Sequence, residues 1–315
     1  MKENYKIETK CVQGAYEPKN GEPRVLPIYQ STTYKYDTSE AMAKLFDLEP
    51  GYMYTRLANP TNDMVAAKIT MLEGGVAGVL TSSGQAANFF ALVNIMGAGD
   101  HFISAATIYG GTFNLFNVTM RKLGIEVTFV DPNASEEEIE KAFRPNTKAV
   151  FGETIANPSL DVLDIEKFAK LAHAHGVPLV IDNTFPTPIN CRPFEFGADI
   201  VTHSTTKYME GHASIIGGAV IDSGNFDWEQ NDKFPGLTQP DESTTAQFTH
   251  AISARQAMLQ KSLPSFSAIS VQLPHRRMRS TSTSALKRLH CVWKDTVQTL
   301  RRLQSTLQIT IKFHG

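Results

Sequence analysis

Short apolar segments alternate with helical patterns along residues 78–221, and this alternation is the feature that most constrains how the chain can fold. Uniformly apolar strands are typical of sheets covered on both faces, and strands separated by helices pair in parallel. The pattern predicts an α/β fold with a mostly parallel, seven-stranded sheet between two layers of helices. The expected strands are Gly78–Thr81, His101–Ser104, Val127–Val130, Ala149–Glu153, Leu179–Asp182, Ile200–His203 and Ile215–Ile221.

The same pattern divides the chain into parts. We expect the helices between the strands at Gln85–Met96, Thr112–Leu123, Glu136–Ala142 and Ile165–His175, the last of which stops at Gly176 as helices often do. Residues 1–65 are irregular and rich in Tyr, Pro and Thr, which is typical of an arm that folds on another surface. Residues 66–243 are expected to form a single large domain.

Residues 244–315 differ in composition from everything before them. They contain 11 basic residues and one acidic residue, whereas residues 1–243 contain 19 basic and 31 acidic residues. A basic segment of this kind can be a nucleic-acid-binding appendage, or it can be a surface helix followed by a loop. The hypothesis that we favour is a shifted reading frame, which would make this tail non-native or truncated.

Charge and hydropathy exclude several classes of protein. The net charge of −2 gives no reason to expect a nucleic-acid partner. No apolar run is long enough to span a membrane, and the charged amino terminus lacks the apolar region of a secretory signal, so we expect a cytoplasmic protein. The three cysteines of the chain are scattered, and neither His173 with His175 nor His203 with His212 forms a recognisable metal-binding set, so no metal is expected.

Polar side chains follow four of the expected strands directly. In open α/β sheets the ligand lies beyond the carboxyl ends of the strands, so these residues are expected to meet at one edge. They are Ser83, Gly84 and Gln85 after the first strand, Asn157 after the fourth, Asp182 at the end of the fifth, and Ser204, Thr206 and Lys207 after the sixth.

The chemistry of these groups points to one cofactor. Backbone N–H groups at a helix start after Ser83 can bind an anion, and Lys207 can act as a nucleophile towards an aldehyde. Asp182 can pair with a protonated ring nitrogen, and Tyr109 offers an aromatic face. Taken singly, each residue could instead be a cap, a surface lysine or a core aromatic. Together they favour pyridoxal phosphate.

Residues 1–243 resemble the Cys/Met-metabolism family of pyridoxal-phosphate enzymes, which have an aspartate-aminotransferase-like fold. The segment DIVTHSTTKYMEGH at 199–212 follows the family's lysine signature and departs from it only at Ala213. YTRLANPT at 54–61 is similar to the family's amino-terminal motif. KYMEGHA, together with DSGNFDW at 222–228, is most similar to the O-acetylhomoserine sulfhydrylases of this family.

The resemblance implies a role for each candidate residue. Lys207 would bind the cofactor covalently and then transfer protons, Asp182 would keep the ring nitrogen protonated, and Tyr109 would stack on the ring. Asn157 would contact the 3′ oxygen or the substrate carboxylate. Tyr54 and Arg56 would reach the phosphate of a neighbouring subunit's cofactor, which implies a homodimer at least, and we expect a tetramer. Ser83, Gly84, Gln85, Ser204 and Thr206 would hold the phosphate.

The implied reaction is γ-replacement on an amino-acid substrate, O-acetyl-L-homoserine, by sulfide or a thiol, giving homocysteine or methionine and acetate. The alternatives are a related γ-lyase or cystathionine γ-synthase, and a cofactor-binding protein without catalytic activity. The last alternative arises because residues 244–315 contain no convincing counterpart of the arginine with which family members bind the substrate carboxylate.

Overall fold

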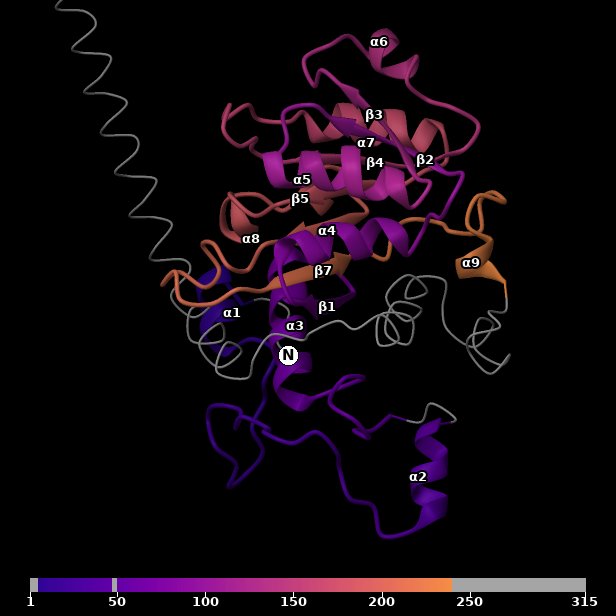
Figure 1. The fold of residues 1–315 in the computed structure, drawn as a ribbon. Helices are drawn as coiled ribbons and strands as arrows, with labels where there is room; N and C mark the ends of the chain where they lie inside the picture. Colours follow the sequence, from indigo (N-terminus) through magenta and orange to yellow (C-terminus); the bar gives the residue numbers. More distant parts are fainter. Residues whose placement is uncertain (1–4, 47–49, 240–315) are drawn as a thin grey trace, which may run out of the picture.

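The computed structural model describes residues 5–46 and 50–239 of the 315-residue chain. The proposed non-native tail, residues 244–315, therefore lies outside the described residues. The strands are β1 (Ala77–Thr81), β2 (His101–Ala105), β3 (Glu126–Val130), β4 (Thr147–Glu153), β5 (Leu179–Asp182), β6 (Ile200–His203) and β7 (Gly218–Asp222). They form one seven-stranded sheet in the order β1-β7-β6-β5-β4-β2-β3. Figure 1 shows this sheet with β1 towards one edge and β3 towards the other. The predicted fold class is confirmed.

Strand β7 departs from the prediction in position and direction. It pairs antiparallel with both β1 and β6, whereas the remaining neighbours are parallel. It also begins at Gly218 and not at Ile215, because the backbone N–H and C=O of Gly217 bond to the Thr206 hydroxyl at 3.1 Å. A segment that pairs with a side chain in this way is not available to a neighbouring strand.

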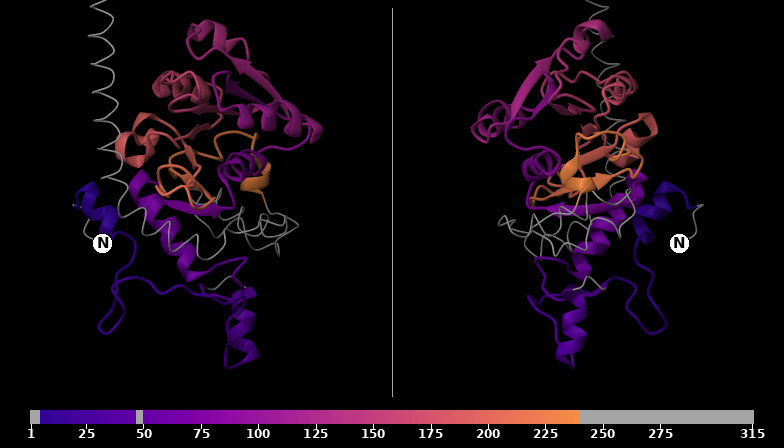
Figure 2. Two further views of the ribbon diagram at one scale, coloured as in Figure 1. Left: turned by 60° about the vertical axis from the view of Figure 1, so that its left-hand side comes forward. Right: turned by 90° about the vertical axis from the view of Figure 1, so that its right-hand side faces the viewer.

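Helices cover both faces of the sheet. The described helical segments are α1 (Ile7–Gln13), α2 (Ser39–Phe46), α3 (Pro60–Glu73), α4 (Gly84–Val93), α5 (Gly110–Asn114), the π-helical η1 (Leu115–Met120), α6 (Glu136–Glu140), α7 (Ile165–Ala174), α8 (Thr187–Asn190), the 3-10 helix η2 (Pro193–Phe196) and α9 (Pro235–Thr238). Helices α4 and α5 lie on one face, and α3, α7 and α8 lie on the other (Figure 2). The expected three layers are therefore present.

The predicted helix Thr112–Leu123 differs in conformation. The chain forms α5 and continues directly into the π-helical η1, which ends at Met120. Phe116 on η1 packs edge to face against Phe102 on β2 and Phe151 on β4, with ring centroids 5.0 and 4.9 Å apart. These fully buried rings lie in the main core, so packing decides the local winding of this helix.

The expected arm is only partly irregular. Helix α1 packs on α3, where Cys11 is buried against Val65 and Ile69, so the start of the arm rests on its own subunit. Helix α3 begins at Pro60, behind an Asn59 side chain that accepts from the Thr61 N–H, and it spans the predicted boundary at 65/66. The segment that carries α2 extends away from the sheet (Figures 1 and 2).

A buried carboxylate at the end of β7 makes stability depend on pH. The pKa of Asp222 is raised to about 7, first because burial disfavours the ionised form and also because the Asp199 carboxylate is near. Its folded pKa lies above the unfolded value of about 4, so the folded state binds more protons between these values. This contribution to stability is present at low pH and is lost as the pH rises from about 4 to about 7.

We expect Asp222→Asn to flatten the pH dependence of the free energy of unfolding over this range, as measured by urea denaturation at a series of pH values. The exposed Asp227, changed to Asn, is the matched control and should leave the slope unchanged. An Asp222→Asn variant with the wild-type slope would show that the pKa of this carboxyl group is the same in the folded and the unfolded state.

Candidate active site

A cavity of about 220 Å³ opens at the carboxyl edge of the sheet, where the sequence predicted a site. Its wall comes from the start of α4, the ends of β4 and β5 and the loop after β6. Nine of the predicted residues line it, namely Ser83, Gly84, Gln85, Tyr109, Asn157, Asp182, Ser204, Thr206 and Lys207. The structure therefore brings together groups that are up to 124 positions apart in the sequence.

Helix α4 begins at this cavity. The Ser83 side chain caps the helix by accepting from the Ala86 N–H at 3.1 Å. A Cβ on Gly84 would lie 2.4 Å from the Cβ of Ser204, so only glycine allows the helix start to approach the loop after β6 this closely. The first residues of α4 and the side chains of Ser204 and Thr206 thus line the same cavity, and a helix start of this kind suits a bound anion such as a phosphate.

Three donors hold the carboxylate of Asp182. The Asn88 amide on α4 donates to Oδ2 at 3.0 Å, and the backbone N–H of Thr184 donates to Oδ1 at 3.0 Å. The Thr184 hydroxyl also donates to Oδ1 and accepts from the Ser204 N–H at 2.8 Å. These bonds link Asp182 to α4 on one side and to the loop that carries Lys207 on the other.

A second carboxyl group, Glu153, lies beside Asp182 and was missed by the sequence analysis. The parallel register of β4 and β5 pairs these two residues directly, and both line the cavity. Burial, and then the adjacent Asp182 charge, raise the pKa of Glu153 to about 8. The signal in the sequence was an acid as the last residue of an otherwise apolar strand.

The remaining predicted residues differ in how firmly they are held. Thr206 is tied to Gly217, and the Gln85 amide donates to the Thr112 hydroxyl at 3.0 Å. The Tyr109 side chain is 49% exposed, and Lys207 is also exposed to solvent at the cavity. An exposed lysine and aromatic ring beside a held carboxylate leave room for a ligand between them.

Tyr54 and Arg56 do not line this cavity. The Arg56 guanidinium lies over the Tyr54 ring, 5.3 Å from its centroid, and the Tyr54 side chain is 39% exposed. The cavity of this chain is therefore built without the arm residues that the sequence motif singled out.

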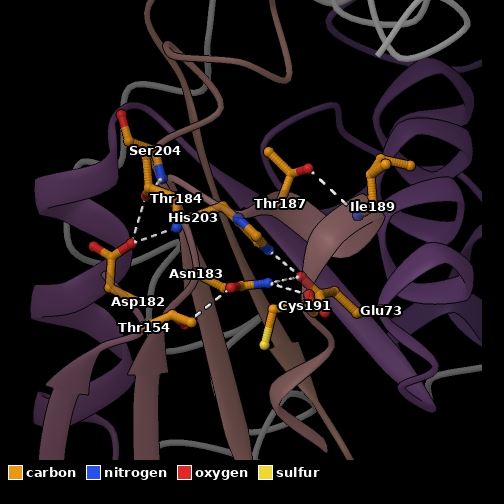
Figure 3. Close-up of polar contacts among 10 residues, drawn as sticks. All are labelled: Glu73, Thr154, Asp182, Asn183, Thr184, Thr187, Ile189, Cys191, His203 and Ser204. Carbon is orange, nitrogen blue, oxygen red and sulfur yellow. Dashed lines mark hydrogen bonds and ion pairs between the residues drawn. The ribbon is translucent and has the colours of Figure 1, made fainter. Parts of the chain in front are cut away.

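A buried polar network lies behind the cavity (Figure 3). Nε2 of His203 donates to Oε1 of Glu73 at 2.5 Å, and both side chains are fully buried. The amide of Asn183 donates to the same oxygen at 2.9 Å and also to the carbonyl of Cys191. Because Asn183 follows Asp182 and His203 precedes Ser204, this network fixes two strand ends that border the cavity.

The residues fit the cofactor that the sequence implied. The close approach at Gly84 forms a cradle that a Cβ would fill, a held carboxylate faces the same space, and a lysine borders it. In the described ranges 5–46 and 50–239, no group of three or more His, Cys, Asp or Glu residues could hold a metal ion. Within these same ranges, no helix is long and apolar enough to cross a membrane.

Comparison with known proteins identifies close relatives of this site. The family described as Cys/Met metabolism PLP-dependent enzyme matches residues 8–260, which extends 17 residues beyond the resemblance noted in the sequence. The O-acetyl-L-homoserine sulfhydrylase of Leptospira meyeri is 46% identical over 77% of this chain and 55% of its own length. The protein of the same name from Corynebacterium glutamicum is 49% identical over 69% of this chain and 51% of its own.

A solved structure with a related name is also similar to this chain. The crystal structure of a Campylobacter jejuni protein provisionally named O-acetylhomoserine (thiol)-lyase superposes with a TM-score of 0.86 at 31% identity, covering 91% of this chain and 70% of the other. That structure contains a pyridoxyl-lysine monophosphate residue. The chain described here spans about half the length of the curated relatives it matches.

Gly84 gives the first test of the anion cradle. We expect Gly84→Ala to weaken pyridoxal phosphate binding by about tenfold or more, because relieving the contact with Ser204 costs on the order of 1–3 kcal/mol. Cofactor titration measures this loss. Gly97→Ala is the matched control, since a Cβ there meets nothing within 4 Å. Equal affinities for the two variants would contradict the cradle.

The Glu73–His203 pair gives a second test, of stability. Glu73→Ala removes the acceptor of the His203 ring and one of the two acceptors of the Asn183 amide, so we expect a loss of about 3–5 kcal/mol in the free energy of unfolding. Glu73→Gln keeps an oxygen acceptor and should lose clearly less. Urea denaturation measures both, and equal losses would show that the network contributes only through packing.

Proposed function

Because the chain belongs to the Cys/Met metabolism family of PLP-dependent enzymes, we propose that it catalyses γ-replacement on O-acetyl-L-homoserine with sulfide or a thiol. In this reaction a C–S bond forms at Cγ and the C–O bond to acetate breaks, giving homocysteine or methionine. The observation that carries the proposal is the meeting of Lys207, Asp182 and the start of α4 at one cavity. The names of the two sulfhydrylase relatives support the choice of substrate.

Different residues of the cavity would hold different parts of the cofactor. When bound, pyridoxal phosphate supplies an electron sink for negative charge that develops on the substrate. The first turn of α4, with Ser83, Gly84 and Gln85, would hold its phosphate together with Ser204 and Thr206. Asp182 would keep a proton on the ring nitrogen, and its three donors orient the carboxylate.

Lys207 would carry the protons of the reaction. Its side chain borders the cavity at an exposed position, so its amine can bind the cofactor and later reach the substrate. A proton must leave Cα and then Cβ before acetate can depart from Cγ, and a nearby amine serves as general base for such steps. Tyr109 and Asn157 would position the ring from two loops that meet at the same cavity.

The second candidate is a protein that binds the cofactor without turnover. A γ-lyase or cystathionine γ-synthase is the rival within the same chemistry. Assays that supply O-acetylhomoserine with and without sulfide distinguish replacement from elimination.

The arm supports a proposal about assembly. Residues 17–25 and 27–30 are mostly exposed, and Tyr54 and Arg56 lie outside the cavity of their own chain. We propose that Tyr54 and Arg56 complete the site of a second copy, which makes the protein a homodimer at least. The proposal extends to a tetramer in the cytoplasm. Residues 1–65 would then act as the arm and residues 66–243 as the cofactor-binding domain.

Lys207→Ala tests the cofactor site directly. We expect the wild-type chain with pyridoxal phosphate to show the visible absorption of a lysine-bound cofactor and to retain it covalently after borohydride reduction. The variant should lose both, and peptide mapping of the reduced wild type should place the cofactor on Lys207. Lys167→Ala, on α7, is the matched control. Labelling at any other lysine would contradict the assignment.

Turnover is then measured with the same wild-type preparation. Acetate release from O-acetylhomoserine that depends on sulfide supports γ-replacement. Release without sulfide, accompanied by an oxo acid, would identify a γ-lyase. A bound cofactor with no release in either assay would establish the second candidate.

A further inference from the structure

The strongest unassigned feature of the cavity is the carboxyl group of Glu153. It is the last residue of β4 and is 9% exposed. Oε1 accepts a hydrogen bond from the backbone N–H of Tyr109 at 2.9 Å. The backbone N–H of Asn157 donates to the same carboxyl group. One side chain thus binds the main chain at the two loop residues proposed to contact the cofactor ring.

The Tyr109 backbone is also tied to α5, since its carbonyl accepts a hydrogen bond from the Phe113 N–H at 2.9 Å. Tyr109 precedes α5 and makes no side-chain cap to this helix. Its ring lies against Gly111, where a Cβ would be 2.5 Å from Cε1 of Tyr109. Gly111 thus leaves space for this ring, and Glu153 holds the backbone that carries it.

We propose that Glu153 is a positioning residue: its carboxyl group fastens the backbone at Tyr109 and Asn157, and so sets the ring contacts of the cofactor from two loops at once. The proposal rests on the proposed cofactor site. It gives a reason for a buried acid beside Asp182, where a second negative charge would otherwise oppose the first.

The charge state of Glu153 fits this role. Among the described residues that line the cavity, the titratable groups facing it are Asp182 on β5, Tyr109 before α5 and Lys207 after β6. Burial and the Asp182 charge raise its pKa, so near neutral pH it is uncharged and accepts the two N–H groups without competing with Asp182. Ionisation at alkaline pH would place two charges side by side and disturb both loops.

Three variants of the full chain test the proposal. Glu153→Gln keeps an oxygen acceptor and remains neutral, Glu153→Ala removes the acceptor, and Glu166→Gln on the exposed start of α7 is the matched control. Amide hydrogen exchange is measured in the cofactor-free protein on peptides that contain Tyr109 and Asn157. The exchange rates show directly whether Glu153 holds these two backbone N–H groups. The absorption and circular dichroism of bound pyridoxal phosphate show whether the position of the cofactor ring has changed.

We expect Glu153→Ala to speed exchange at these two amides by about tenfold or more, because each loses its acceptor. Its bound cofactor should have an altered spectrum, and kcat should fall on the order of 10²-fold with a smaller change in KM. Glu153→Gln should keep wild-type exchange and spectrum at neutral pH. It should also lack the alkaline transition that the wild type shows in the cofactor band and in kcat/KM.

Two outcomes overturn the proposal. Unchanged exchange and spectrum in Glu153→Ala would show that the carboxyl group does not position the loops. A Glu153→Gln variant that behaves like Glu153→Ala would show that an ionised carboxylate is required. If Glu153→Ala does not fold, Glu153→Gln and the pH dependence decide the question alone. If the wild type shows no turnover, the proposed reaction fails while exchange and spectrum still test Glu153.

Discussion

Two carboxyl groups side by side at the end of a parallel sheet are the constraint on which this site depends. The register of β4 and β5 pairs Glu153 with Asp182, and neighbouring residues in register point to the same face. Two negative charges this close together, with little water around them, each disfavour the ionised form of the other. The structure resolves this conflict by giving Asp182 three donors and by raising the pKa of Glu153 through burial.

The partners of these two acids connect every part of the cavity. Asp182 reaches α4 through Asn88 and the Lys207 loop through Thr184, while Glu153 reaches the loops at Tyr109 and Asn157. Behind them, the buried Glu73–His203 pair ties α3 to the ends of β5 and β6 (Figure 3). The cavity is therefore shaped by polar contacts that are buried, and buried contacts of this kind are costly to break.

The described part of the chain supplies the groups that a cofactor requires, and the arm supplies residues that its own cavity does not use. This division is consistent with our proposal that two copies of the chain share their sites. It also separates two questions that experiments can take in turn, namely whether the cofactor binds at Lys207 and whether the chain, at about half the length of its relatives, turns over substrate.

Local sequence determined the strands, four helical segments between them and nine of the cavity residues, because apolar runs, caps and strand-end polar residues carry their signal within a few positions. Only the tertiary structure decided that β7 runs antiparallel between β1 and β6, and that η1 is π-helical around Phe116. It also decided that Glu153 faces Asp182 and that Tyr54 and Arg56 lie away from the cavity. Strand order, register and partner distance depend on residues far apart in the chain, and no local pattern encodes them.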